Sequence, residues 1–352
     1  MTGDVQLSEF KLPLTHPIRT SKGKHSARAG FAINIEQDGV VGVGEATPLE
    51  GWTEGLTECH DALHKCIDSA EEPWRWRLPV EAPAARHGLQ LAVSDLAART
   101  AEQSLAMYLA DEQWKEKVPV NATIGLIPVE HISSQLEGAI DAEFPAVKVK
   151  IGHEPLRASL ARLDEISAYT NDIAIRLDAN QSWELETARE VIDTAAEIGV
   201  TLIEEPITSP DVSKLGELSD TGVDIALDES LISRRPIDRK AWLQRVNAVV
   251  IKPMAIGGID RAIELVAQAR ELGVKPILST TIDGIIARAA AVHVAAAVGI
   301  STPSGLGTAG WIAEDLSEDI IPVKDGWINV PKSPGIGTAT TINETVLMEP
   351  SS

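Results

Sequence analysis

The sequence predicts an α/β protein in which a closed (β/α)7β barrel is joined to an α+β capping domain. From residue 118 onward, short β-branched runs alternate with amphipathic helical stretches, which is typical of βαβ units and a parallel sheet. Seven or eight such units follow one another within about 200 residues. This rhythm fits a TIM-like closed barrel better than an open, doubly wound sheet.

The capping domain is predicted over residues 1–116, where this rhythm is missing. Two short β-branched runs, residues 31–36 and 40–45, flank the turn Gln37-Asp38-Gly39, which is a hairpin signal. The two helical stretches that follow are residues 53–69, with Thr53 as the N-cap, and the Ala-rich residues 89–109. Strands followed by helices are typical of an α+β lobe.

The barrel is predicted over residues 117–320. Its strands are predicted at residues 118–124, 146–151, 173–178, 201–204, 224–228, 248–252 and 275–279. Gly199, Gly222 and Gly273 precede strands, at the point where a glycine commonly ends a helix. Residues 321–352 are rich in proline and glycine and do not continue the alternation of strands and helices, so we predict a C-terminal segment that returns to the capping domain.

Composition excludes several classes of partner. The chain has 31 Lys or Arg and 52 Asp or Glu among 352 residues, a net charge of −21, which argues against nucleic acid and anionic membranes. We find no apolar run long enough for a membrane span and no secretory signal. Two cysteines are too few for a disulfide framework, so we expect a reducing compartment, the cytoplasm. The oligomeric state stays open.

Charged residues follow the apolar runs of five consecutive predicted strands. They are Lys148 and Lys150, Asp178, Glu204, Asp228 and Lys252. Active sites of such barrels lie at the carboxyl ends of the strands, so these side chains should meet there. A lone charge at a strand end more often meets solvent, but chance does not readily place one on five strands in a row. Glu205 has the opposite strand parity, which favours a surface or supporting role.

Three converging carboxylates would repel one another without a cation among them. Oxygen ligands favour Mg²⁺, so Asp178, Glu204 and Asp228 are candidate metal ligands. Lysines would then flank the metal on both sides, and a lysine beside a dication favours its neutral form and can act as a general base. This apparatus suits removal of a proton next to the carboxylate of a small-molecule substrate, with the metal stabilising the enediolate.

The strings KVK, RLDAN, EEP, LDES and VIKP resemble the enolase superfamily, in its muconate-cycloisomerase-like subgroup. The resemblance covers nearly the whole chain and implies Mg²⁺, with Mn²⁺ as a substitute, on the three carboxylates. It implies that Lys150 and Lys252 are the acid/base catalysts on the two faces of the substrate. The candidate substrate contacts are Lys148, Arg176, Asn180, Ser279, Thr280 and Gly305.

Within the subgroup, Arg176-Leu177-Asp178, VIKP and the string Gly305-Leu306-Gly307-Thr308 resemble the o-succinylbenzoate synthases. These are Mg²⁺-dependent lyases of menaquinone biosynthesis that dehydrate 2-succinyl-6-hydroxy-2,4-cyclohexadiene-1-carboxylate. Dipeptide epimerases usually carry an Asp-x-Asp at the end of the last barrel strand, which holds the ammonium group of the substrate. The corresponding residues 303–308 contain no carboxylate, which counts against an ammonium-bearing substrate. The alternatives are an N-succinylamino acid racemase, a dipeptide epimerase or a muconate cycloisomerase and, from another class, a non-catalytic carboxylate-binding barrel.

Overall fold

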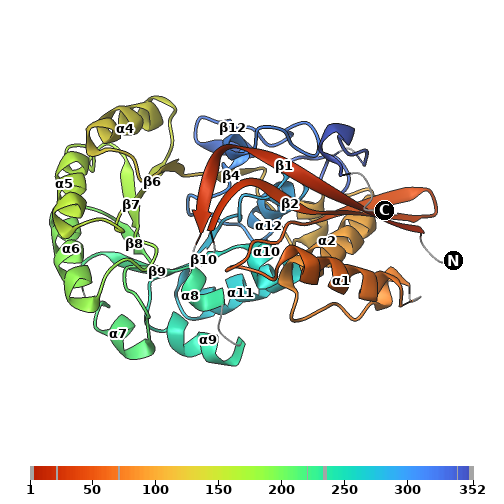
Figure 1. Ribbon diagram of the computed structural model, residues 1–352, viewed down its shortest axis with the longest axis horizontal. Helices are drawn as coiled ribbons and strands as arrows, with labels where there is room; N and C mark the ends of the chain where they lie inside the picture. The colour runs from red at the N-terminus through yellow and green to blue at the C-terminus, as the bar shows by residue number, and fades with distance from the viewer. Residues whose placement is uncertain are drawn as a thin grey trace.

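The computed structural model describes residues 4–20, 23–69, 72–219, 221–232, 236–338 and 340–348. A barrel with its helices occupies the left and centre of Figure 1, and the capping strands and helices lie to the right. The barrel sheet contains seven parallel strands in the order β11-β10-β9-β8-β7-β6-β5. The predicted fold class, a (β/α)7β barrel with an α+β cap, is confirmed.

The cap is built on an antiparallel sheet of three strands, β1 (Asp4–Thr20), β2 (Gly23–Gln37) and β3 (Val40–Ala46). The predicted hairpin is confirmed, since Asp38 and Gly39 turn the chain with φ of 52° and 80°, as a two-residue hairpin loop requires. Strand β1 was not predicted, because Pro13 and Pro17 interrupt its pattern. The strand nevertheless pairs with β2 from Asp4 to Thr20, with one irregularity between Pro13 and Ile18.

Three α-helices and a short 3-10 turn complete the cap: α1 (Leu56–Ile67), η1 (Pro73–Arg75), α2 (Pro83–Thr100) and α3 (Leu105–Leu109). The prediction of Thr53 as an N-cap is wrong, because α1 begins after Gly55. Thr53 Oγ1 instead accepts from Leu49 N at 2.8 Å. The single helix predicted over residues 89–109 is also wrong. It divides where Glu102 adopts a φ of 54°, and Ser104 then caps α3.

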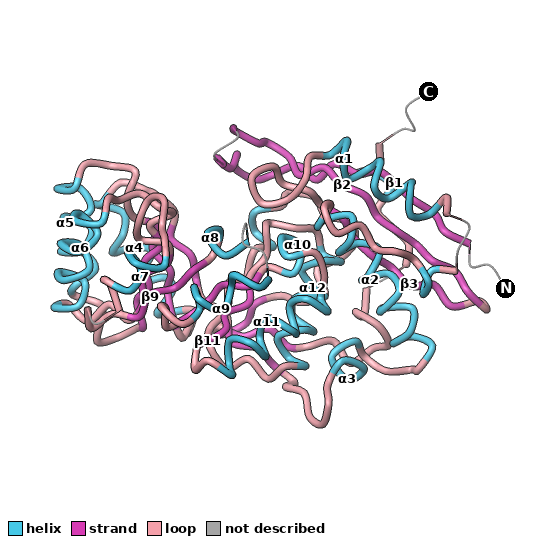
Figure 2. Tube along the Cα trace, turned by 90° about the horizontal axis from the view of Figure 1, so that it is seen from below, coloured by secondary structure: helices cyan, strands magenta, loops and turns pink. Residues whose placement is uncertain are grey.

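Six of the seven predicted barrel strands each correspond to one observed strand, whereas the predicted strand 118–124 divides into β4 (Lys117–Pro119), which pairs outside the barrel sheet, and β5. The barrel strands are β5 (Ala122–Ile124), β6 (Ala146–Lys150), β7 (Ala174–Asp178), β8 (Leu202–Glu204), β9 (Asp224–Leu227), β10 (Ala248–Ile251) and β11 (Lys275–Leu278). The helices that follow them are α4 (Ile132–Asp141), α5 (Leu156–Ser167), α6 (Leu185–Glu197), α7 (Val212–Gly216), α8 (Glu229–Ile232), α9 (Pro236–Leu243), α10 (Pro253–Ile256), α11 (Ile259–Glu271) and α12 (Ile285–Ala297), with the 3-10 turn η2 (Val129–His131) before α4. Figure 2 shows α5 and α6 on the outer side of the barrel, at the end remote from the cap.

A short extended segment closes the barrel between its two outer strands. Ser304 bridges Val120, just before β5, and Gly305 bridges Ser279, just after β11. Asn121 N donates to Ser304 O at 3.0 Å, and Gly305 N donates to Leu278 O at 2.8 Å. Residues 304–305 therefore take the position of the eighth strand.

The C-terminal segment contacts both parts of the chain. Strand β13 (Trp327–Asn329) pairs with β12 (Val323–Lys324) on one side and with β4 (Lys117–Pro119) on the other. The 3-10 turns η3 (Ala309–Trp311) and η4 (Glu344–Val346) lie before and after these two C-terminal strands in sequence. Leu347 bridges Phe10 of β1, and Met348 N donates to Glu9 O at 3.0 Å. The boundaries 1–116, 117–320 and 321–352 stay a prediction. Among the described residues, no helix has the length and apolarity that crossing a membrane requires.

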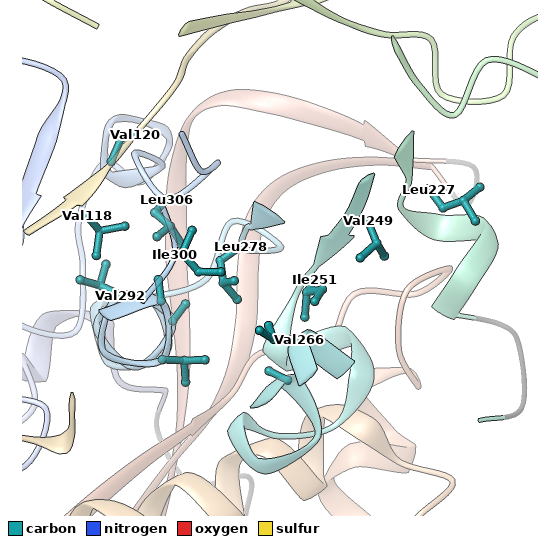
Figure 3. Close-up of a cluster of buried hydrophobic side chains, with 14 of the residues drawn as sticks. Val118, Val120, Leu227, Val249, Ile251, Val266, Leu278, Val292, Ile300 and Leu306 are labelled. Atoms are coloured by element: carbon teal, nitrogen blue, oxygen red, sulfur yellow. The ribbon is translucent and has the colours of Figure 1, made fainter. Parts of the chain in front are cut away.

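The main hydrophobic core lies between the barrel strands and the helices outside them. In Figure 3, side chains of β10 and β11 gather with side chains of α11 and α12. Those labelled there include Val249, Ile251, Leu278, Val266 and Val292. Phe10 and Leu12 of the cap belong to the same core, so cap and barrel bury apolar surface together.

A buried histidine in this core makes stability depend on pH. His293 Nδ1 accepts from Ala106 N, and Nε2 donates to Ile336 O, both at 3.1 Å. Burial lowers the pKa of His293 to about 4. Between that value and the ordinary histidine pKa of about 6.5, the unfolded chain therefore binds a proton that the folded chain does not bind. The stability due to neutral His293 should be complete above pH 6.5 and lost as the pH falls toward 4, by about 1.4 kcal/mol per pH unit. We expect the difference in urea midpoint between wild type and His293→Gln to shrink from pH 7.5 to pH 5. A constant difference would contradict this role.

Candidate active site

Five neighbouring strands bring charged side chains to one edge of the barrel. Parallel register pairs Lys150 with Asp178 and Asp178 with Glu204, so the ends of β6, β7 and β8 lie at one level. Asp228 follows β9, and Lys252 follows β10. The predicted gathering of charges at the carboxyl ends of the strands is what the structure contains.

On one side of this edge, Lys148 and Lys150 contact the carboxylate of Asp178. Lys150 Nζ donates to Asp178 Oδ2 at 2.6 Å and to Asn180 Oδ1 at 2.7 Å. Lys148 Nζ lies 3.0 Å from Asp178 Oδ2 and 3.3 Å from Glu204 Oε2. Asn180 has a φ of 43°, a left-handed conformation that asparagine tolerates. Its side-chain amide thereby reaches Lys150.

On the other side, Lys252 Nζ donates to Asp228 Oδ2 at 2.5 Å. The same ammonium lies 3.5 Å from the centroid of the Trp52 ring, in a cation–π contact. Trp52 belongs to the capping lobe, in the loop between β3 and α1. The cap therefore covers the site on the Lys252 side.

Burial and mutual charge shift the ionisation of the carboxylates. Burial alone would raise the pKa of Asp178, but the ammonium groups of Lys148 and Lys150 lower it well below its usual range. Burial, reinforced by the charge of Asp178, raises the pKa of Glu204 to about 8. Burial also raises the pKa of Asp228, although Lys252 opposes this. For Glu204 and Asp228, the effect of burial on the pKa thus outweighs that of the neighbouring lysines.

Comparison with protein families matches residues 131–344 to the family described as "Enolase C-terminal domain-like". The match covers more than half of the chain. The chain belongs to the enolase superfamily. The predicted resemblance is confirmed at this level, and the chain is an enzyme of this superfamily.

Relatives within the superfamily have different activities. The chain is 25% identical to the L-Ala-D/L-Glu epimerase of Bacillus subtilis over 95% of both sequences. A solved structure of that epimerase has the same fold, with a TM-score of 0.86 over 97% of this chain and 100% of the other, at 23% identity. The chain is 27% identical to the chloromuconate cycloisomerase of Pseudomonas sp. strain P51 over 93% of both. Membership therefore leaves the reaction open.

A third relative was solved with a metal ion and a dipeptide. The dipeptide epimerase from Methylococcus capsulatus, complexed with Mg and the dipeptide L-Arg-D-Lys, is 26% identical, with a TM-score of 0.83 over 96% of this chain and 99% of the other. Mg²⁺ is thus a metal of the superfamily. Its ligands in this chain stay a prediction.

The donor set of this superfamily member fits a hard cation. No three His, Cys, Asp or Glu side chains among the described residues form a group that could hold a metal ion as they stand. Lysine ammonium groups lie against all three carboxylates. Yet Asp228 Oδ1 is buried and has no hydrogen-bond partner in the described part of the chain. A buried carboxylate oxygen without a hydrogen-bond partner suits Mg²⁺, which takes oxygen ligands.

Of the two places predicted for Glu205, the surface is wrong, because the residue is buried, and it has a supporting place instead. Its Oε1 accepts from Asp228 N at 2.7 Å and from Ser230 N at 2.8 Å. Its Oε2 accepts from Ser230 Oγ at 2.5 Å. Burial and the nearby charge of Glu229 raise the pKa of Glu205 to about 8. Glu205 therefore fixes the turn that presents Asp228.

The remaining predicted contacts form a wall beside Lys252. Ser279 N donates to Ile251 O at 2.9 Å, which places Ser279 next to the end of β10. Ser279 Oγ donates to Gly305 O at 3.2 Å, and the hydroxyls of Thr280 and Thr308 lie 2.9 Å apart. A Cβ on Gly305 would approach Ser279 Oγ to 2.7 Å. The wall thus presents hydroxyl groups and bare backbone.

Arg176 has a different environment from the other predicted contacts. It lies two residues before Asp178 on β7, deeper in the barrel, and its Nη1 donates to Pro303 O at 2.6 Å. This bond supports the segment that closes the barrel. The role of Arg176 in substrate binding stays a prediction.

Sequence reasoning missed two residues at the site. Trp52 and Glu229 line a cavity of about 700 Å³ between the cap and the helices that follow β9 and β10. Glu229 directly follows Asp228, and its Oε2 is buried without a hydrogen-bond partner among the described residues. An aromatic residue in a loop flanked by Gly51 and Gly55, just after a strand, was the available signal for Trp52.

Proposed function

We propose that this enzyme is an o-succinylbenzoate synthase, a Mg²⁺-dependent lyase that dehydrates 2-succinyl-6-hydroxy-2,4-cyclohexadiene-1-carboxylate. The observation that carries the proposal is the wall formed by Ser279, Thr280 and residues 303–308. It contains hydroxyls and backbone but no carboxylate. Dipeptide epimerases of the family usually have an Asp-x-Asp there to hold the substrate's ammonium. The wall suits a side chain that ends in a carbonyl or a carboxylate.

The two lysines perform the chemistry in this proposal. Lys150 removes the proton from the carbon that carries the ring carboxylate, while the neighbouring C–O bond breaks. The same ammonium then returns the proton to the departing hydroxyl, which leaves as water, and the ring becomes aromatic. Lys252 stays cationic and stabilises the negative charge that develops on the carboxylate. Mg²⁺ held by Asp178, Glu204 and Asp228 would supply further stabilisation of that charge when bound.

The direct test is the formation of o-succinylbenzoate by the purified protein with MgCl₂. The product contains a benzene ring, so its formation can be followed by absorbance and verified by mass spectrometry. L-Ala-L-Glu and an N-succinylamino acid, each in D₂O, serve as competing substrates. Deuterium exchange at an α-carbon without any o-succinylbenzoate would overturn the proposal.

An epimerase or racemase is the second candidate, because two lysines lie at opposite sides of the carboxylates. In that reaction Lys150 and Lys252 would exchange protons across one α-carbon, so Lys252 must act as a base. A synthase requires only a cation at this position.

Lys252→Arg should separate these candidates, because a guanidinium stays charged and cannot accept a proton. For a synthase we expect Lys252→Arg to retain most of the turnover that Lys252→Ala loses, about 10²–10³-fold for a lost electrostatic stabiliser. The measurement is kcat for o-succinylbenzoate formation by both variants. Equal losses in the two would mean that Lys252 transfers a proton.

Trp52→Ala should impair the site from the capping side. Loss of the ring above Lys252 removes a cation–π contact of about 0.5–2 kcal/mol, so kcat/KM should fall by roughly 2- to 30-fold. Trp52→Phe keeps an aromatic face and should lose less. Similar losses in both variants would show that the indole itself contacts the substrate.

A further inference from the structure

One buried guanidinium joins the cap to the barrel beside the candidate site. Arg28 of β2 is 2% exposed. Its Nη1 donates to Pro48 O at 2.9 Å and its Nη2 to Thr47 O at 2.7 Å, both in the loop that leads to Trp52. Its Nε donates to Ile282 O at 3.1 Å, in the turn after β11. Asp283, whose Oδ1 lies 3.9 Å from Nη2, balances the charge.

The turn that Arg28 holds is strained. Ile282 has a φ of 62°, in the left-handed region where a β-branched residue is a genuine outlier. The Asp283 carboxylate accepts from Thr281 N at 3.1 Å and from the Thr281 hydroxyl. These two bonds fix the backbone of residues 281–283. Backbone strain of this kind persists only where the surroundings impose it, and it is concentrated at functional sites.

A second residue of the cap fixes the end of the same turn. Glu45 of β3 is fully buried and accepts from Gly284 N at 2.7 Å and from Ala287 N at 2.9 Å, at the start of α12. A Cβ on Gly284 would approach Glu45 Oε2 to 2.9 Å. The Thr47 hydroxyl donates to the same carboxylate. The turn from β11 to α12 is therefore shaped by side chains of the capping lobe.

These contacts determine the spacing of two walls of the site. One wall is the cap loop, in which Leu49 N donates to Thr53 Oγ1 beside Trp52. The other is the hydroxyl wall, in which Thr280 Oγ1 accepts from Ile282 N at 3.4 Å and contacts Thr308. Arg28 alone among these residues donates to both loops.

We propose that Arg28 is a positioning residue that sets the substrate side-chain pocket, by fixing the Trp52 loop of the cap against the Ser279–Thr280 wall of the barrel. The inference rests on the proposed function for its substrate. The hydrogen bonds of Arg28 go to the two loops and not to the lysines, which lie on β6 and directly after β10. Its loss should therefore affect substrate binding more than proton transfer.

The test uses the double variant Arg28→Met/Asp283→Asn, which removes the charge and its counter-charge together and avoids leaving an unpaired buried ion. We expect KM for the synthase substrate to rise tenfold or more, with kcat within about threefold of wild type. Arg28→Lys keeps the charge but loses the planar fork, so its KM should also rise. An unchanged KM in the double variant would overturn the proposal.

A matched control removes a partly buried ion pair of the cap. Arg99 Nε lies 2.6 Å from Asp95 Oδ2, away from both loops. Arg99→Met/Asp95→Asn should lower the melting temperature and leave KM unchanged. A raised KM in this control would show that loss of stability alone explains the effect, against the proposal.

Hydrogen–deuterium exchange separates this inference from the proposed function, since it needs no substrate. In Arg28→Met/Asp283→Asn, amides of residues 47–53 and 279–284 should exchange faster, while those of β6 and β10 keep their protection. This result would support the positioning role even if wild type formed no o-succinylbenzoate. Unchanged exchange in both loops would overturn the positioning role even if the synthase activity were established.

Discussion

Lys150→Ala is expected to abolish turnover while leaving the fold intact. Lys150 ends β6, and its side chain is 32% exposed, so the variant leaves no cavity in the core. A positioned general base typically contributes about 10²–10⁴-fold to the rate. We therefore expect kcat for o-succinylbenzoate formation to fall by at least that factor, and the melting temperature with Mg²⁺ to stay close to wild type.

Lys275→Ala is the matched control for this prediction. Lys275 lies at the opposite end of the barrel, at the start of β11, where its Nζ is 2.6 Å from Asp224 Oδ2. That exposed pair should contribute little to stability, and the variant should turn over like wild type. Activity of Lys150→Ala within tenfold of wild type would remove Lys150 from the mechanism.

The strand-end charges could be predicted because they are local features of sequence. Each apolar run predicts a strand, and Lys150, Asp178 and Glu204 each lie at the carboxyl end of such a run. Active sites of barrels lie at that edge of the sheet. The hairpin at Asp38-Gly39 was predictable for the same reason, since two residues determine the turn. These predictions needed no knowledge of tertiary contacts.

What could not be predicted depends on contacts between distant segments. Arg28 meets Ile282 across 254 residues, and Glu45 meets Ala287 across 242. Nothing near Arg28 in the sequence distinguishes it from a surface arginine. The break between α2 and α3 was missed because residues 89–109 have good helix propensity. In the structure, the hydrogen bond from Leu105 N to Gly335 O stabilises a turn at this point instead. Tertiary hydrogen bonds override local propensity in both cases.

Mg²⁺ is expected to stabilise the protein well beyond its effect as a salt. The net charge of −21 means that NaCl alone should raise the melting temperature by screening repulsion. Mg²⁺ should add a specific effect, because burial and Asp178 raise the pKa of Glu204 to about 8, and a dication among these carboxylates relieves their repulsion. At a concentration 100 times its Kd, a ligand adds about 2.7 kcal/mol.

The measurement is a thermal melt in MgCl₂ against NaCl of the same ionic strength, together with turnover after EDTA treatment. We expect an excess stabilisation by Mg²⁺ in wild type, loss of turnover with EDTA and its recovery with added MgCl₂. Asp228→Asn keeps the size of the side chain but removes one charged ligand, so the excess should largely disappear. Asp224→Asn, at the other end of β9, should keep it. Equal melting temperatures for wild type in the two salts would remove the metal site, and with it the role assigned to all three carboxylates.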